Sequence, residues 1–419
     1  MNHSRTFYGW YLVAVLWLVY FITVGFIFYG ANVINTAMVR DLGMDRKTLG
    51  AGFAFFHLIQ SGLSAPLAAM LINRKGIRFT LALGCILATA GSLLMATVVA
   101  SSTLFLAVFG ILIGLGIGLG GVLSVQTGIT LWFVKKRALA MSAALTASGI
   151  GGFVAAPALN ALITAGPHEW KTAWIFVGGL CTVAFLITVT FVKNKPSDLG
   201  QVPDGGEEAP KVHEDAAKPH LAVYRTSRHW TPKEALRTRN LWLIFIGIVG
   251  FLVPYLFCIA HGVIHLLDRG YAPAAAAMSL GLITLFTFIG KLIGGVLGDR
   301  IEPRYVWGAS LALMGAGVLI GMNAAGAVSL YLYTILVGAG FGCAFVLMPT
   351  VIGNFFGPYA FASIVGIISP LFTLFSSASP FIAGLIYDKI GSYDAAFIGA
   401  GLFCLAGMAA ILAVKPTEE

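Results

Sequence analysis

A lysine inside an apolar segment is the first residue whose chemistry needs an explanation. Lys291 lies in FTFIGKLIGGVLGDR, residues 286–300, which is apolar along most of its length. None of the 17 Asp and Glu residues of the chain lies in the interior of a long apolar run. A cation at the centre of a bilayer costs about 2.5–3.5 kcal/mol on insertion scales, and an ionisable residue there marks a functional site by default.

The depth of Lys291 decides between three interpretations. It stands eight residues before Asp299, which is about 12 Å along a helix, so in a hydrocarbon core of about 30 Å it lies near the midplane. Its side chain can snorkel toward the headgroups, or remain buried in the neutral form. The third interpretation is a water-filled cavity in which an anionic substrate meets the cation. We expect this third arrangement, with Lys291 as the binding residue.

Three histidines are the other titratable side chains inside the apolar runs: His57, His261 and His265. His261 and His265 are four residues apart and share a helix face, but a zinc site needs three or four ligands, so we expect no metal and no cofactor. We expect His261 to face the substrate, where it hydrogen-bonds the ligand or carries a proton. His57 is the second proton-coupling candidate, with a structural hydrogen bond as the alternative. We expect His265 to be solvated at the outer interface.

The elements that position these residues are predicted to be membrane helices. The chain has 419 residues, of which 58% are hydrophobic and only 10% are charged, whereas soluble domains carry about 25% charged residues. Apolar runs of about 20 residues cross a bilayer as helices, because lipid offers backbone groups no hydrogen-bonding partner. We predict an all-α polytopic membrane protein with twelve spans: 8–31, 48–72, 79–100, 104–131, 138–165, 172–192, 240–267, 274–298, 304–325, 327–352, 361–387 and 394–414.

The spans fall into two halves that repeat one another. AMLINRKGIR (residues 69–78) corresponds to GVLGDRIEPR (residues 295–304), and both halves have a glycine-rich fourth span, as in transporters built from duplicated six-helix units. We predict an N-terminal six-helix bundle over residues 1–192, a cytoplasmic linker over 193–239 and a C-terminal six-helix bundle over 240–419. TPKEALR, within the linker, is predicted to form a short surface helix.

The basic residues predict the orientation. With both termini in the cytoplasm, 19 of the 26 Lys and Arg residues lie on the cytoplasmic side, as the positive-inside rule requires. We therefore expect a multi-pass protein of the plasma (inner) membrane. The net charge of +9 is explained by this asymmetry, so we expect no nucleic-acid partner.

GVLGDRIEPR resembles the conserved loop of the major facilitator superfamily. An acid at a helix end, with basic residues nearby, suits a latch that breaks as two halves rock. Asp299 is expected to sit at a helix terminus and pair with Arg300 or Arg304. Two positions depart from the family pattern, because Asn73 replaces the usual acid of the first copy and Glu302 replaces the usual Gly of the second. The predicted gating loops comprise Asn73, Arg74, Arg78, Asp299, Arg300 and Arg304.

Four further stretches narrow the resemblance: YGWYLV, WFVKKRALA, DLGQVPDG and WTPKEALRTRNLW. Together they look like the bacterial monocarboxylate transporter and oxalate/formate antiporter group of that superfamily. Eukaryotic relatives carry an acid one turn before an Arg in span eight, and the matching residues here are Thr287 and Lys291. The family's fold implies that spans one, four, seven and ten line the cavity. The remaining candidates for the binding site are Tyr29, Gln126, Thr127, Thr287 and Phe345.

The leading hypothesis is secondary active transport of a small carboxylate, most of all a monocarboxylate, by alternating access. The resemblance implies proton symport or anion exchange, and we expect a functional monomer in the lipid bilayer. An enzyme is not expected, because no His-Glu-x-x-His or Gly-x-Ser-x-Gly sequence is present. Two alternatives stay open: an exporter of lipophilic compounds of the same superfamily, and a membrane sensor that transports nothing.

Overall fold

The computed structural model describes residues 7–44, 46–164, 169–204 and 223–416. These residues form two compact units. The first unit comprises residues 1–134, 143–206 and 365–370, and the second comprises 135–142, 207–364 and 371–419. Of the predicted linker, residues 205–222 lie outside the described residues, and the division of the chain at 192 and 240 stays a prediction.

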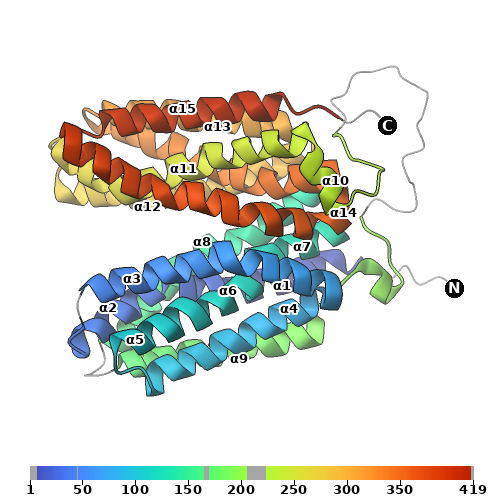
Figure 1. Cartoon of the computed structure of the whole chain (residues 1–419), viewed down its shortest axis with the longest axis horizontal. Coiled ribbons are helices and arrows are strands. Elements are labelled where there is room, and N and C mark those ends of the chain that lie inside the picture. Colours follow the sequence, from blue (N-terminus) through green and yellow to red (C-terminus); the bar gives the residue numbers. More distant parts are fainter. Residues whose placement is uncertain (1–6, 45, 165–168, 205–222, 417–419) are drawn as a thin grey trace. The chain divides into compact units, whose positions relative to one another are not determined.

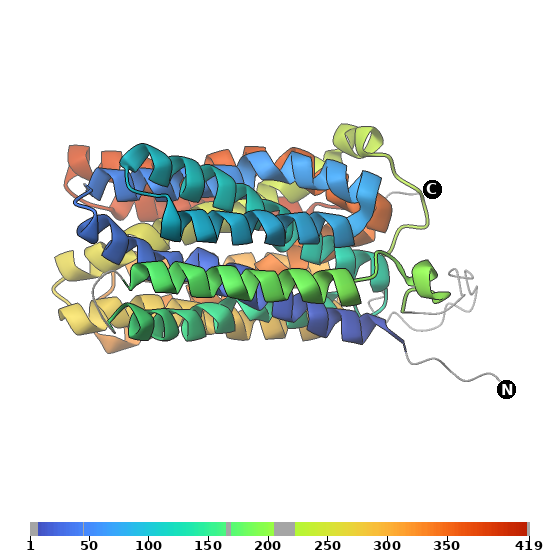
Figure 2. The ribbon, with the colours of Figure 1, turned by 90° about the horizontal axis from the view of Figure 1, so that it is seen from below.

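Helices account for most of the described chain (Figures 1 and 2). Up to the linker they are α1 (Gly9–Tyr20), η1 (Phe21–Tyr29), α2 (Ala31–Asp41), α3 (Arg46–His57), η2 (Leu58–Leu63), α4 (Ser64–Thr97), α5 (Ser102–Phe105), η3 (Leu106–Ile113), α6 (Gly114–Gly120), α7 (Val122–Trp132), α8 (Arg137–Ile163), α9 (Trp170–Phe191) and η4 (Pro196–Leu199). From the linker onward they are α10 (Pro232–Arg237), α11 (Arg239–Asp268), α12 (Pro273–Gly298), α13 (Pro303–Met322), α14 (Ala327–Ile390) and α15 (Asp394–Leu412).

Ten continuous helical runs in the described chain are long and apolar enough to cross a membrane. Two of them, Thr48–Thr97 and Ala327–Ile390, are 50 and 64 residues long. Each contains a glycine with left-handed backbone angles, Gly76 (φ 85°) in α4 and Gly357 (φ 77°) in α14. Glycine adopts this conformation without a steric penalty, so each run is divided into two segments. Divided in this way, the ten runs give the twelve spans that the sequence predicts, although the first run continues to Asp41, beyond the predicted end at residue 31.

Close packing of small residues recurs within each unit. In the second unit, a Cβ added to Gly338 would lie 2.4 Å from the Ile283 carbonyl oxygen, so α14 packs directly on the backbone of α12. In the first unit, a Cβ added to Gly118 would lie 1.8 Å from the Ser64 hydroxyl. Small residues permit such approaches between membrane helices. Glycine-rich spans therefore fix which faces of neighbouring helices meet.

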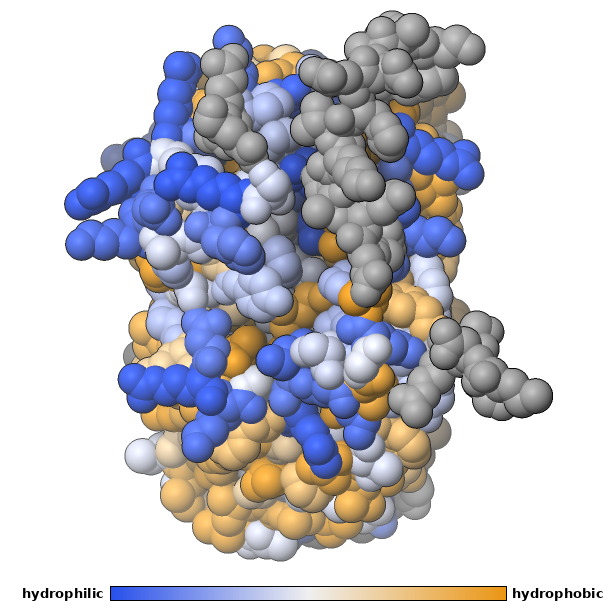
Figure 3. Space-filling model, turned by 90° about the vertical axis from the view of Figure 1, so that its right-hand side faces the viewer, coloured by the Kyte–Doolittle hydropathy of each residue, from blue (hydrophilic) through white to orange (hydrophobic). Residues whose placement is uncertain are grey.

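A capping box begins the short helix α10. Thr231 and Glu234 form a capping box at the start of α10, with the Thr231 Oγ1 accepting from the Glu234 N–H at 3.3 Å and Glu234 Oε2 accepting from the Thr231 N–H at 2.8 Å. This arrangement supplies partners for two N–H groups that a helix start leaves open, and it confirms the predicted short helix. Figure 3 looks onto the helix ends nearest α10, where hydrophilic side chains gather.

Candidate functional site

Lys291 is buried on the face of α12 that packs against α14, with 6% of its surface exposed. A Cβ added to Gly342 would lie 2.0 Å from the carbonyl oxygen of Thr287 and 2.9 Å from the backbone nitrogen of Lys291. Because the two backbones approach so closely, Phe345 of α14 reaches the lysine, and its ring centroid lies 5.4 Å from the Nζ atom. An ammonium within about 6 Å of an aromatic ring is attracted to the ring's face.

Stacked aromatic rings continue from Phe345 away from the lysine. Phe341 stacks on Phe345 with 5.6 Å between centroids and 27° between planes. Tyr255 of α11 stacks on Phe341 with 3.5 Å between centroids and 10° between planes. The result is an aromatic wall that begins at a buried cation. This combination suits a ligand with an anionic group at one end and a short apolar group at the other.

Thr287 adds a hydroxyl one helical turn before Lys291. The residue is 6% exposed, and its Oγ1 atom has no hydrogen-bond partner within the described part of the chain. Leaving a buried polar group unsatisfied costs about 1–3 kcal/mol. Residues four apart share a helix face, so this hydroxyl and the ammonium of Lys291 lie on the same side of α12. A ligand oxygen accepting from the hydroxyl would remove that cost.

His261 is held by two hydrogen bonds within the second unit. Its Nε2 atom lies 2.9 Å from the carbonyl oxygen of Pro380 and its Nδ1 atom lies 3.0 Å from the Tyr393 hydroxyl. A carbonyl only accepts, so Nε2 carries the proton and, in the neutral ring, Tyr393 donates to Nδ1. A direct bond from His261 to a substrate therefore requires one of these contacts to open. Its predicted role in substrate binding and proton coupling stays a prediction.

His265 lies where the sequence did not place it. The residue is 4% exposed, its Nε2 atom is 3.0 Å from the carbonyl oxygen of Gly321, and its ring centroid is 4.4 Å from that of Phe397. The prediction of a solvated side chain was wrong. The physical reason is that the end of α13 and the side of α15 cover this face of α11, which the nearby charges Asp268 and Arg269 did not indicate.

Four of the residues predicted to bind substrate or carry a proton lie in the first unit. Gln126 and Thr127 of α7 are buried, the Thr127 hydroxyl donates to the Leu123 carbonyl at 2.7 Å, and the Gln126 Nε2 atom has no partner among the described residues. Tyr29 is 38% exposed. The exposed ring of His57 lies edge-on to Phe28, with 5.2 Å between centroids. Their roles in binding and coupling stay predictions.

The second gating loop is tied to α8. Both carboxylate oxygens of Asp299 accept backbone N–H groups of the first turn of α8, from Ala138 and Leu139, each at 2.9 Å. An acid at a helix N-terminus satisfies open N–H groups and complements the helix dipole. The Arg304 Nε atom lies 3.7 Å from the Glu302 Oε1 atom, and the Arg304 guanidinium donates to the carbonyl of Val414. Arg300 follows Asp299 at the end of α12.

Glu302, which the sequence marked only as a departure from the family pattern, fixes the linker. Its Oε2 atom accepts the backbone N–H of Tyr224 at 2.7 Å, and the residue is 3% exposed. Burial raises the pKa of the Glu302 carboxyl, although the Tyr224 bond and the Arg304 charge act in the opposite direction. No sequence signal links two residues 78 positions apart, so this contact was missed.

In the first gating loop, Arg78 has neutral partners. Asn73 and Arg74 are exposed next to the break at Gly76. The backbone N–H of Arg78 donates to the Asn194 Oδ1 atom at 3.0 Å, and the Arg78 guanidinium donates to the carbonyl of Val189.

No cluster of three or more His, Cys, Asp or Glu side chains with metal-binding geometry occurs among the described residues.

Comparison with known proteins places the chain in a family. The sequence matches the model of the Major Facilitator Superfamily over residues 16–285 and 263–419. The chain belongs to this superfamily. Monocarboxylate transporter 12 of Rattus norvegicus is 27% identical over 360 residues, which cover 81% of this chain and 72% of the relative. Monocarboxylate transporter 2 of Meriones unguiculatus is 23% identical over 425 residues, with 96% and 83% covered.

Solved structures of major facilitator proteins have the same fold. The Escherichia coli fucose:proton symporter superposes with a TM-score of 0.74 at 15% identity, covering 97% of this chain and 98% of that protein. The human organic anion transporter MFSD10 gives a TM-score of 0.69 at 18% identity, covering 96% and 99%. The predicted fold and the resemblance to monocarboxylate transporters are confirmed. This major facilitator transporter is a multi-pass integral membrane protein with a small-molecule substrate.

Proposed function

We propose that this major facilitator transporter carries small organic anions, most of all monocarboxylates, by alternating access. The observation that carries the proposal is the buried Lys291 of α12, with the Phe345 ring 5.4 Å from its ammonium. The Thr287 hydroxyl, which has no hydrogen-bond partner in the described chain, lies one turn away. Relatives named monocarboxylate transporters support the same substrate class.

Charge favours a monoanion over a dianion. Lys291 is the one Lys or Arg that the sequence places well inside an apolar run, so a bound monocarboxylate brings the local charge near zero. A dicarboxylate leaves about one negative charge in a site of low dielectric constant, which costs several kcal/mol. Protonation of His261, which belongs to the same unit as Lys291, would offset that charge. We therefore expect dicarboxylates to gain relative to monocarboxylates as the pH falls through the histidine range.

Proton coupling is assigned to His261, with His57 as the second candidate. Protonation of His261 makes both ring nitrogens donors. The bond to the Pro380 carbonyl is then kept, and the Tyr393 hydroxyl changes from donor to acceptor across the same 3.0 Å contact. The ring can thus gain or lose a proton without leaving its place in the second unit. A proton symporter can use such a group, whereas an anion exchanger does not need one.

The setting of this activity is also proposed from the sequence. With 19 of the 26 Lys and Arg residues on one side, both termini lie in the cytoplasm and the protein resides in the inner membrane. The carrier works as a monomer of two six-helix bundles joined by the linker, without catalysis, cofactor or nucleic-acid partner. Proton and counter-anion are the two possible co-substrates.

Proteoliposomes test the proposal. Uptake of lactate-like and succinate-like anions is measured at about pH 5.5 and about pH 7.5, the two sides of the histidine range, with and without internal substrate. We expect the monocarboxylate to be preferred at the higher pH and the dicarboxylate to gain at the lower pH. Uptake that is faster with internal substrate would indicate anion exchange, and uptake that is driven by an imposed proton gradient would indicate proton symport. Succinate preferred at the higher pH would contradict the charge argument.

A further inference from the structure

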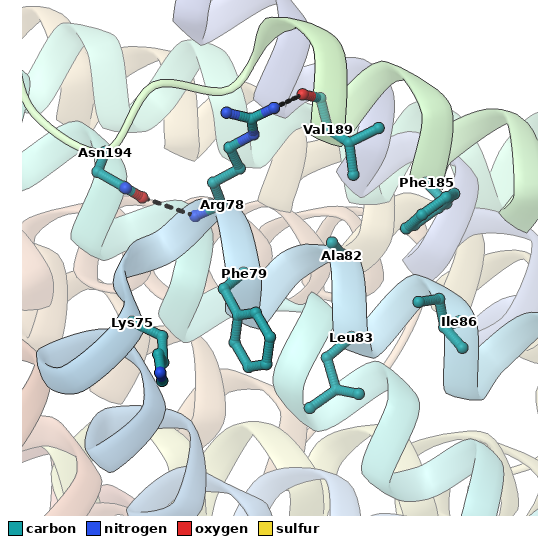
Figure 4. Close-up of a pocket in the computed structure, with 9 residues that line it drawn as sticks. All are labelled: Lys75, Arg78, Phe79, Ala82, Leu83, Ile86, Phe185, Val189 and Asn194. Carbon is teal, nitrogen blue, oxygen red and sulfur yellow. Dashed lines mark hydrogen bonds between the residues drawn. The ribbon is translucent and has the colours of Figure 1, made fainter. Parts of the chain in front are cut away.

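A groove on the surface of the first unit has one basic end and one apolar end. It has a volume of about 420 Å³ and lies between α4 and α9, which run side by side (Figures 1, 2 and 4). Lys75, Arg78 and Asn194 line one end, and apolar side chains line the rest. Among the described residues that line it, two are cations and none is an acid.

The basic end is held in place by the break in α4. Gly76 has a φ of 85°, and a Cβ there would lie 2.4 Å from the Asn194 Oδ1 atom. That Oδ1 accepts the backbone N–H of Arg78 at 3.0 Å. The guanidinium of Arg78 donates to the Val189 carbonyl, at the open C-terminal end of α9. A guanidinium has five N–H donors, so the bond to Val189 fixes Arg78 and leaves donors to spare.

The apolar end belongs to membrane-spanning segments. Phe79 and Ile86 of α4 are each 46% exposed, and Phe185 of α9 closes the other side of the groove. Figure 4 shows Phe79 and Leu83 projecting from the same side of α4, with the Lys75 side chain beside them. From Arg78 to Ile86 the helix rises about 12 Å, within one leaflet of a hydrocarbon core of about 30 Å.

We propose that this groove binds a glycerophospholipid with an anionic headgroup, whose phosphate meets Lys75 and Arg78 and whose acyl chain lies along Phe79, Leu83 and Phe185. A lipid combines the two chemistries that the groove presents, at the depth where its headgroup and chain lie. Each basic residue at the end of a membrane helix raises the affinity for an anionic lipid about fivefold. For the two cations together, we therefore expect a preference of about 25-fold over a zwitterionic lipid.

Native mass spectrometry of the full chain tests the proposal by titration with phosphatidylglycerol and, separately, phosphatidylcholine. We expect Lys75→Ala to weaken phosphatidylglycerol binding about fivefold, as one cation should. Leu83→Trp fills the apolar part without changing charge, and we expect it to abolish the bound lipid. Lys171→Ala, which removes an exposed lysine at the other end of α9, is the matched control and should change nothing.

Three results would overturn the proposal. Equal binding of the two lipids would remove the role of the basic end. A loss in Lys171→Ala as large as in Lys75→Ala would mean that charge acts diffusely rather than in the groove. Displacement of phosphatidylglycerol by glycerol phosphate at equal concentration would show that the headgroup alone binds and that the apolar end contributes nothing.

Discussion

Replacing Thr287 by valine is expected to stabilise the empty protein and weaken substrate binding at the same time. The Thr287 hydroxyl is buried and has no partner within the described chain, so removing it should raise the free energy of unfolding by about 1–3 kcal/mol, the usual cost of an unsatisfied polar group. A hydrogen bond from a hydroxyl to a carboxylate contributes about 1.5–3 kcal/mol. Its loss should raise the substrate Kd by about 10- to 150-fold.

Two measurements on the same purified variants separate these effects. Thermal unfolding in detergent without ligand reports stability, and calorimetric titration with a lactate-like anion reports the Kd. Thr284→Val is the matched control, because the Thr284 hydroxyl already donates to the Leu280 carbonyl at 2.9 Å and the residue is exposed on the same helix. A Thr287→Val protein that unfolds at a lower temperature, or that binds the anion as tightly as the parent, would refute the assignment of this hydroxyl to the substrate.

Three further predictions concern the second unit. His261→Gln should flatten the pH dependence of uptake. His265→Gln should lower thermal stability and leave the pH dependence of uptake unchanged. If neither variant changes that pH dependence, His261 is not the proton carrier. Because burial raises the pKa of Glu302 above its ordinary 4.5, the folded protein binds this proton more tightly than the unfolded chain, and stability should fall as the pH rises from about 4.5 through the raised pKa. Glu302→Gln should abolish that fall in thermal unfolding measured across pH, and an unchanged fall would assign it to another group. Gly342→Ala should push α14 away from α12 and impair anion binding. Gly281→Ala is the control, because nothing lies within 4 Å of the added Cβ, and it should bind the anion normally. Normal binding by Gly342→Ala would show that the anion site does not depend on close packing of these two helices.

The spans could be predicted from the sequence because each is set by its own apolar length. In lipid, a helix pairs its backbone N–H and C=O groups within one segment, so a span can be predicted without knowing which segments pack against it. The breaks at Gly76 and Gly357 were also visible, as polar or turn-forming residues between apolar runs. Lys291 could be singled out from the sequence because a cation inside an apolar run is rare.

The surroundings of these residues could not be predicted, because they depend on which helix faces meet. The 5.4 Å contact of Lys291 with Phe345 follows from the close packing of α12 on α14 at Gly342. The burial of His265 depends on the end of α13, which its own neighbours in sequence do not reveal. Likewise, the bond from Tyr224 to Glu302 joins the linker to a loop 78 residues away.

Substitution of Lys291 is the most direct test of anion binding at the centre of the second unit. Removing one partner of a buried charge pair costs about 2–5 kcal/mol, so Lys291→Ala should raise the Kd for a lactate-like anion at least about 30-fold. Lys291→Arg should retain part of the affinity, because the charge is kept and only its geometry changes. Lys171→Ala, an exposed lysine, is the control. Calorimetric titration of the purified variants should show that anion affinity is lost in Lys291→Ala, partly retained in Lys291→Arg and unchanged in Lys171→Ala. A Lys291→Ala protein that binds the anion normally would contradict the proposed function.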